Sequence, residues 1–188
     1  MAEQNFASLG KVEAIRLLYE GTPFTAYAGA WFETSGKAYS TTKSTVLSEG
    51  IDFDLVYFPL KHLGYKSVVA VTGELYAEMS HPRTMDIKIG VSAKLDLSQI
   101  RELWSGIVAA ARDYGYSKVG LDLVPSRNGL TLSVSANGET SINTKRPKAE
   151  SKDLIRVSGS LGAAFFGQQV LEREKLRFDK DGSQPNLE

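Results

Sequence analysis

Two histidines and a set of scattered carboxylates are the side chains of this chain that could do chemistry, because it contains no cysteine. Without cysteine there are no disulfides, thiolate zinc sites, iron–sulfur clusters or cysteine nucleophiles. His62 and His81 would each need a further convergent partner to act as a zinc ligand or general base, and the sequence identifies none. We therefore interpret His62 as structural, predict no metal site, and keep the carboxylates as the candidates.

Three carboxylates, Asp52, Glu74 and Asp122, have plain structural interpretations from the residues around them. Asp52 and Asp54 alternate with apolar residues, so both would project from one face of a strand and could hold a cation. A solvated strand face explains this alternation better. Asp122 lies in the strand-like run 118–124, where an exposed or loop-capping carboxylate is the plainer interpretation, and the same holds for Glu74.

The run Ser158–Gly162 is similar to a phosphate-binding glycine loop, because a strand-to-helix position would aim its backbone N–H groups at an anion. It lacks the lysine of a P-loop, so the motif is a weak signal. We do not base a nucleotide site on it.

Composition and charge exclude several classes of protein. The 22 Lys and Arg residues balance 22 Asp and Glu residues, so no basic field is available to hold nucleic acid or an anionic membrane. A hydrophobic fraction of 42% and a charged fraction of 23% are typical of a globular domain. No apolar run reaches the ~18–20 residues of a membrane span, and the first ten residues lack the pattern of a secretory leader. We therefore expect a cytoplasmic protein that binds neither nucleic acid nor membrane.

The periodicity of the apolar residues predicts the elements that position these side chains. A spacing of three to four residues predicts helices over residues 1–20, 59–79, 97–114 and 163–175. Within 59–79 the run VVAV at 68–71 would suit a strand equally well, and we favour the helix. Alternation and β-forming composition predict strands over residues 84–93, 118–124, 130–136 and 153–158. Residues 125–129 are rich in turn formers and predict a hairpin-like loop, and the stretch 24–48, broken at Ser35–Gly36, predicts another hairpin.

A change of composition divides the chain. Residues 137–152 consist mainly of Gly, Thr, Asn, Lys, Pro and Ser, which predicts a linker or long loop. We place one domain over residues 1–150, including this linker. A strand and helix over residues 153–175 and a polar tail over residues 176–188 follow it.

Three stretches together resemble one known family: EGIDFDL at 49–55, PLKHLGYKSVV at 59–69 and LGAAFFGQQVLEREK at 161–175. Their order and spacing are similar to those of Bacteroidetes-type thiamine-monophosphate kinase, in the AIR synthase-related, PurM-like superfamily. The resemblance covers the family's N-terminal domain and the first strand and helix of its C-terminal domain. It implies an α/β (α+β) fold, in which a mixed sheet packs with helices and dimerises through the sheet.

The resemblance also indicates which residues of the family's phosphoryl-transfer site are present in this sequence. In the family, carboxylates from separate motifs hold magnesium ions that bridge the phosphates of ATP and thiamine phosphate. Four of the matched positions have no carboxylate here: Ala28, Gly29, Thr45 and Ser160. Asp52 stands where the family has a histidine, and only Glu74 and Asp122 keep a carboxylate. The resemblance therefore implies a degraded site with no catalytic residue, in which Asp52, Glu74 and Asp122 are the vestigial candidates to bind a nucleotide or a metal ion.

Three hypotheses follow. The leading one is a catalytically inactive relative of thiamine-monophosphate kinase, without cofactor, which forms a homodimer or a heteromer with a related full-length chain and acts as a structural, scaffolding or regulatory protein. The alternative is an ATP- and magnesium-binding, kinase-like subunit completed by a partner chain. A third is a pocket in the vestigial cleft that binds a small ligand. The residues expected to make protein contacts are Trp31, Phe32, Leu161, Phe165, Phe166 and Val170.

Overall fold

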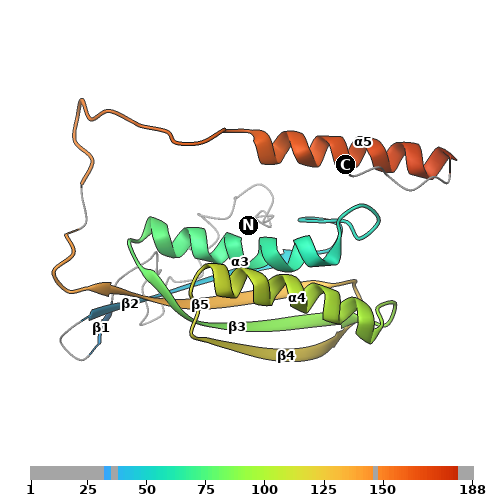
Figure 1. The fold of residues 1–188 in the computed structure, drawn as a ribbon, viewed down its shortest axis with the longest axis horizontal. Coiled ribbons are helices and arrows are strands. Elements are labelled where there is room, and N and C mark those ends of the chain that lie inside the picture. Colours follow the sequence, from blue (N-terminus) through green and yellow to red (C-terminus); the bar gives the residue numbers. More distant parts are fainter. Residues whose placement is uncertain (1–31, 35–37, 146–147, 182–188) are drawn as a thin grey trace, which may run out of the picture. The chain divides into compact units, whose positions relative to one another are not determined.

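The computed structural model describes residues 32–34, 38–145 and 148–181, with side chains at 38–145 and 148–173. The predicted helix over residues 1–20 and the contact residue Trp31 lie outside this range. The described strands form one sheet in the order β1-β2-β5-β3-β4 (Figure 1). Their bounds are β1 Phe32–Thr34, β2 Ala38–Ser48, β3 His81–Ser92, β4 Lys118–Ser126 and β5 Thr131–Ser141. The fold is the predicted mixed α/β arrangement, because β3 and β4 are parallel and the other neighbours are antiparallel.

Three helices have the predicted positions: α3 Leu60–Ala77, α4 Leu97–Asp113 and α5 Ala163–Asp181. Helix α3 begins directly after Pro59, whose extended backbone precedes the first turn. Helix α4 begins with a capping box, in which the Asp96 carboxylate accepts the Gln99 N–H at 2.9 Å and the Gln99 side chain accepts the Asp96 N–H at 3.0 Å. Helix α5 continues to Asp181, beyond the predicted end at residue 175.

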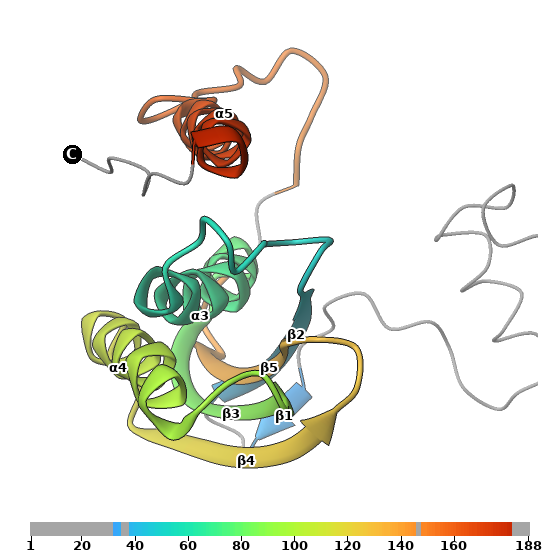
Figure 2. The ribbon, with the colours of Figure 1, turned by 90° about the vertical axis from the view of Figure 1, so that its right-hand side faces the viewer.

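Helices α3 and α4 cover one face of the sheet, and the core lies between these two layers (Figure 2). The inward residues of β3 are those that alternation predicted, such as Met85, Ile87 and Ile89. They pack against the apolar stripe of the helices, which includes Leu63 and Leu103. Among the described residues, no helix covers the opposite face, which we call the open face of the sheet.

The predicted hairpin between the strands at 118–124 and 130–136 is wrong. Among the described strands, β4 pairs only with β3, in parallel, whereas β5 lies between β2 and β3 and is antiparallel to both. The chain passes from β3 through α4 to β4, and such a crossover places two parallel strands side by side. One edge of β3 is then occupied, so β5 pairs along the other edge. The predicted hairpin between β1 and β2 is present, with Thr34 opposite Ala38.

Two predicted boundaries are also wrong. Residues 137–141 belong to β5, because their backbone continues the ladder with β2 as far as the pair Ala38 and Ser141. Ladder hydrogen bonds come from the backbone, so a polar composition does not end the strand. Strand β3 begins at His81, before the predicted residue 84, and runs through Pro82 with an irregularity in the register between Pro82 and Thr84.

The predicted strand over residues 153–158 is wrong as well. The backbone there belongs to no strand, and Ile155 is 94% exposed. A strand is stable only when a neighbour accepts and donates its backbone hydrogen bonds, and the described residues supply none to this segment. The division into domains at residues 150 and 175 stays a prediction.

Candidate functional site

Asp52 lies in the turn between β2 and α3 and not on a strand face, so the alternation of residues 51–55 predicted the wrong backbone. Its carboxylate accepts the Ser48 N–H at 2.8 Å, and the Lys66 ammonium donates to its carbonyl oxygen at 2.9 Å. Asp54 likewise accepts the Val56 N–H at 2.9 Å. Each carboxylate therefore holds its own turn, as side chains of this type commonly do.

Glu74 and Asp122 lie on opposite sides of the sheet. Glu74 is exposed on α3, the helix layer. Asp122 is on β4 beside Lys88 of β3, and their side chains form an ion pair at 3.6 Å on the open face. Lys88 alternates with the buried Ile87 and Ile89, which places the pair on the face away from α3. The helix and sheet layers thus stand between the two carboxylates.

The three candidate carboxylates consequently occupy a turn, a helix surface and an edge strand. Within residues 38–145 and 148–173, no group of three His, Asp or Glu side chains comes close enough to hold a metal ion. Both histidines are exposed, His62 on α3 and His81 at the start of β3. Convergence of ligands is what a magnesium or zinc site requires, and these residues do not converge.

The residues expected to make protein contacts have exposed side chains where the structure describes them. Leu161 is 78% exposed, and Phe165, Phe166 and Val170 of α5 are 62%, 69% and 59% exposed. The rings of Phe165 and Phe166 meet edge to face, with centroids 6.1 Å apart. Phe32 begins β1, but its side chain is outside the described atoms.

Two tyrosines, one on α3 and one in the connection between α4 and β4, have raised pKa values. The hydrogen bond from the Tyr65 hydroxyl to the Asp113 carboxylate, 2.9 Å long, raises the pKa of Tyr65. Burial raises the pKa of Tyr116, and its hydrogen bond with the Thr72 hydroxyl at 2.9 Å opposes that effect in part. Both phenols are protonated at neutral pH, so neither serves there as a general base.

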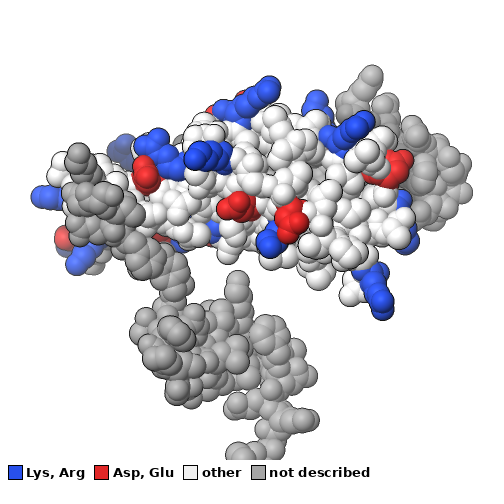
Figure 3. All heavy atoms as spheres, turned by 90° about the horizontal axis from the view of Figure 1, so that it is seen from below, with Lys and Arg blue, Asp and Glu red and all other residues white. Residues whose placement is uncertain are grey.

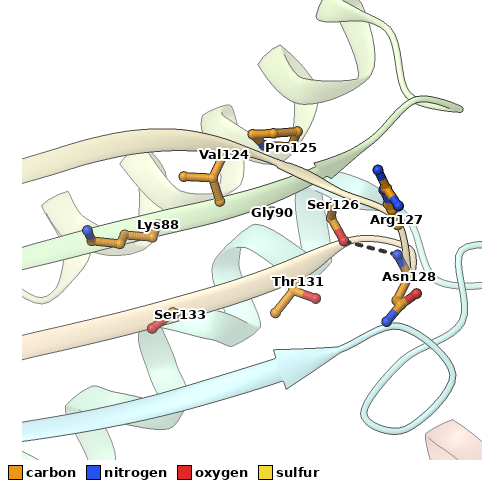
Figure 4. Close-up of a pocket in the computed structure, with 9 residues that line it drawn as sticks. All are labelled: Lys88, Gly90, Val124, Pro125, Ser126, Arg127, Asn128, Thr131 and Ser133. Carbon is orange, nitrogen blue, oxygen red and sulfur yellow. Dashed lines mark hydrogen bonds between the residues drawn. The ribbon is translucent and has the colours of Figure 1, made fainter.

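Sequence reasoning missed a hollow on the open face near the β4–β5 loop (Figure 4). It has a volume of about 380 Å³ and is lined by Lys88, Gly90, Val124, Pro125, Ser126, Arg127, Asn128, Thr131 and Ser133. These residues come from β3, β4, β5 and the loop, and the pairs Gly90–Thr131 and Gly90–Val124 place three strands side by side at this point. A glycine in mid-strand was the signal that could have indicated it, since such a position often marks a close approach.

Comparison with known proteins gives relatives but no matching family model. The chain is 28% identical over 134 residues to thiamine-monophosphate kinase of Aquifex aeolicus and 25% identical over 128 residues to that of Bacillus subtilis. These matches cover 71% and 67% of this chain but 43% and 39% of those proteins. The chain therefore spans less than half the length of these curated relatives.

Solved structures show the same fold. The structure of AaThiL complexed with AMPPCP and TMP matches with a TM-score of 0.75 at 21% identity, over 98% of this chain and 58% of that chain. That of tt0281 from Thermus thermophilus matches with a TM-score of 0.67 at 21% identity, over 96% of this chain and 58% of that chain. The fold is thus that of a PurM-like N-terminal domain.

The sequence matches show that the chain is a relative of thiamine-monophosphate kinase. Its likeness to that group was predicted from the runs at 49–55, 59–69 and 161–175. Within the residues that the structure describes, no helix combines the length and apolar character needed to cross a membrane.

Proposed function

We propose that the chain is a catalytically inactive relative of thiamine-monophosphate kinase that acts as a dimerising structural, scaffolding or regulatory protein. The observation that carries this proposal is the separation of Asp52, Glu74 and Asp122 on three different elements. Phosphoryl transfer depends on metal ions that neutralise and align the phosphates, and therefore on carboxylates that meet around one point. These three carboxylates do not meet.

The local roles of the carboxylates support the same proposal. Asp52 is engaged with the Ser48 N–H, and Asp122 with the Lys88 ammonium. Thr45, one of the positions without a carboxylate, is half-buried in β2 opposite Val134 of β5. Ser160, another such position, is exposed. No cofactor enters the proposal, and ATP with magnesium belongs only to the alternative of a subunit completed by a partner chain.

Dimerisation, either with a second copy or with a related full-length chain, is the second part of the proposal. Its support is the open face, which the described helices leave uncovered, and the β1–β2 hairpin at one edge of the sheet. Viewed from the sheet side, the described surface is mostly uncharged (Figure 3). A mainly uncharged sheet face is a surface on which a second sheet can pack.

The segment 153–175 gives the proposal a second contact surface. We propose that residues 1–150 form the dimerising domain, that 153–175 remain from a second domain, and that 176–188 are a tail. The exposed side chains of Leu161, Phe165 and Val170 are too apolar to be left in water without cost, so docking on a partner would bury them. If the segment folded back onto the chain's own domain, these side chains would also be buried.

A coupled kinase assay and light scattering test the proposal. The chain is mixed with ATP, magnesium and thiamine monophosphate, and we expect no turnover and no magnesium-dependent nucleotide binding. Turnover that disappears in Glu74→Gln or Asp122→Asn would overturn the inactive assignment and support the alternative. Light scattering at micromolar concentration is expected to give a dimer, and a stable monomer that also binds no related chain would contradict the second part.

A further inference from the structure

We propose that residues 154–158 of one copy pair, as an added strand, with the outer edge of β4 in a second copy. The inference rests on the dimerisation proposed above and names a contact that the two copies use. The outer edge of β4 and its helix side are separate from the open face. A second sheet packed on the open face therefore leaves this contact accessible.

Among the described strands, β4 is the last of the sheet, and its outer edge has no neighbour (Figure 1). The backbone N–H and C=O groups along such an edge are free to bond to another strand. Proteins usually cover an edge of this kind or place charges along it, because it otherwise pairs with other chains. The nine residues of β4 are long enough to pair with the whole segment.

The helix side of β4 is apolar and uncovered. Leu121 and Leu123 are 44% and 49% exposed. Their ladder neighbours on β3, Ile87 and Ile89, are 1% and 0% exposed, so the helices cover the sheet as far as β3 and no further. A hollow of about 430 Å³ continues this surface between Leu123 and the first turn of α4. Apolar side chains on an added strand would remove the two leucines of β4 from water.

Residues 154–158 have no strand partner in their own chain. Leu154, Ile155 and Val157 are 85%, 94% and 60% exposed, and all three favour strands or apolar surroundings. A turn precedes the segment, in which the Asp153 carboxylate accepts the Glu150 N–H at 2.7 Å. One chain thus has a free strand edge and an unpaired β-forming segment, and exchange between two copies supplies the missing partner to each.

The linker allows this exchange. Residues 142–152 join the end of β5 to the segment, and at ~3.3 Å per residue they extend to roughly 36 Å. Adjacent strands are about 4.8 Å apart, so this length exceeds the width of the described sheet. The segment can therefore leave its own domain and reach the sheet of a second copy.

Charge and alternation together select the register. Alternate residues of a strand face opposite sides, so Ile155 and Val157 share one side and Arg156 takes the other. With Arg156 opposite Asp122, the two apolar residues lie beside the two leucines of β4, whichever direction the added strand runs. The Asp122 carboxylate is 57% exposed and pairs with Lys88 on its β3 side, so it can accept a second cation from its outer side. Opposite charges at facing positions stabilise the pairing.

Cross-linking between single-cysteine chains tests the contact directly, because the chain has no cysteine of its own. Ile155→Cys is mixed with Leu121→Cys and, separately, with Leu123→Cys, and a short bifunctional maleimide joins thiols that lie close together. Strand pairing raises the local thiol concentration, so one of these mixtures, according to the strand direction, should cross-link about tenfold faster than a control mixture with Ile51→Cys. Ile51 is 84% exposed and lies in the turn after β2. Equal rates in all three mixtures would overturn the proposal.

A charge swap distinguishes exchange between copies from folding back within one chain. Arg156→Glu alone or Asp122→Arg alone puts like charges at the contact, so each should raise the dissociation constant of the dimer about fivefold in analytical ultracentrifugation. A mixture of the two variant chains has an opposite-charge pair at both contacts and should associate like the unchanged protein. Pairing within one chain would leave the mixture as weak as its components, and this result would refute the exchange.

The two sides of the segment provide a matched comparison. Ile155→Ser with Val157→Ser removes the side chains that would cover the leucines of β4, and it should weaken association about tenfold. Leu154→Ser changes an equally exposed residue on the other side of the added strand, and it should weaken association much less. Equal losses per side chain on the two sides would contradict the register.

Val46→Lys separates this contact from dimerisation through the open face. Val46 is 55% exposed on β2 and alternates with the buried Leu47, so it lies on the open face. If the cross-links and the charge swap fail while the chain still forms a dimer that Val46→Lys disrupts, the strand exchange is wrong and the proposed dimerisation stands. If Val46→Lys has no effect while both other tests succeed, the exchange stands and pairing through the open face is wrong.

Discussion

Replacement of Gly106 by alanine should destabilise the protein, although alanine is the better helix former. Gly106 lies in α4 where this helix crosses α3, and a Cβ atom there would overlap the carbonyl oxygen of Lys61 and come within 3.1 Å of the backbone nitrogen of Tyr65. Both neighbours are backbone atoms, so no side chain can turn away. Helix α3 would have to move away from α4, and this movement would disturb the packing of the core beneath both helices.

Two opposing contributions set the change in the free energy of unfolding of Gly106→Ala. Overpacking a close contact costs about 1–3 kcal/mol, and a collision with backbone belongs at the upper end. The higher helix propensity of alanine raises the free energy of unfolding by about 1 kcal/mol relative to glycine. The free energy of unfolding should therefore fall by about 2 kcal/mol. Gly73→Ala is the matched control, because Gly73 lies within α3 and no atom is near its Cβ position. The free energy of unfolding of this variant should rise by about 1 kcal/mol.

Urea and thermal unfolding followed by the helical circular dichroism signal measure the difference. A gap of about 3 kcal/mol between the two variants corresponds to roughly 6–12 °C in the unfolding midpoint for a chain of this size. If Gly106→Ala were as stable as Gly73→Ala, the close crossing of α3 and α4 would be refuted. A folded Gly106→Ala protein of reduced midpoint would confirm the reasoning.

Three further predictions concern the core, the α4 cap and α5. Leu132→Ala removes a fully buried side chain and should lower the free energy of unfolding by about 2–5 kcal/mol in urea titration, whereas a loss below 1 kcal/mol would contradict its burial. The bond from the Gln99 N–H lowers the pKa of Asp96, so its carboxylate stabilises α4 above the unfolded value of about 3.9 and loses this effect as the pH falls through the lower folded value. The midpoint difference between wild type and Asp96→Ala should accordingly be constant from pH 7 to pH 5 and shrink below pH 4, and a difference independent of pH would show that the cap is not charged. Phe165→Asp with Phe166→Asp should leave the thermal midpoint of the sheet domain unchanged and weaken partner recovery, and unchanged recovery would show that α5 makes no such contact.

Local patterns predicted the elements but not their neighbours. The stripe through Leu63, Val68 and Leu75 favoured a helix at α3, although the run at 68–71 suited a strand equally well. The alternation of Ile87 and Ile89 predicted β3, because burial on one side imposes the period of each element. Turn chemistry between β4 and β5 predicted a hairpin that does not exist, since a turn reverses the chain without deciding which edge the next strand joins. The partner of a strand depends on which edges earlier elements have already occupied.

For the candidate site, the sequence supplied residue types and the structure supplied their separation. The sequence by itself determined the absence of thiol chemistry, the balanced charge and most helices and strands, because composition and periodicity are local properties. The resemblance of three sequence runs indicated the likeness to thiamine-monophosphate kinase. Only the tertiary structure decided that Glu74 and Asp122 lie on opposite sides of a sheet and that Lys88, Gly90 and Arg127 surround one hollow. The physical reason is that a site is a set of distances between segments far apart in the chain, and the pairing of β3 with both β4 and β5 sets those distances.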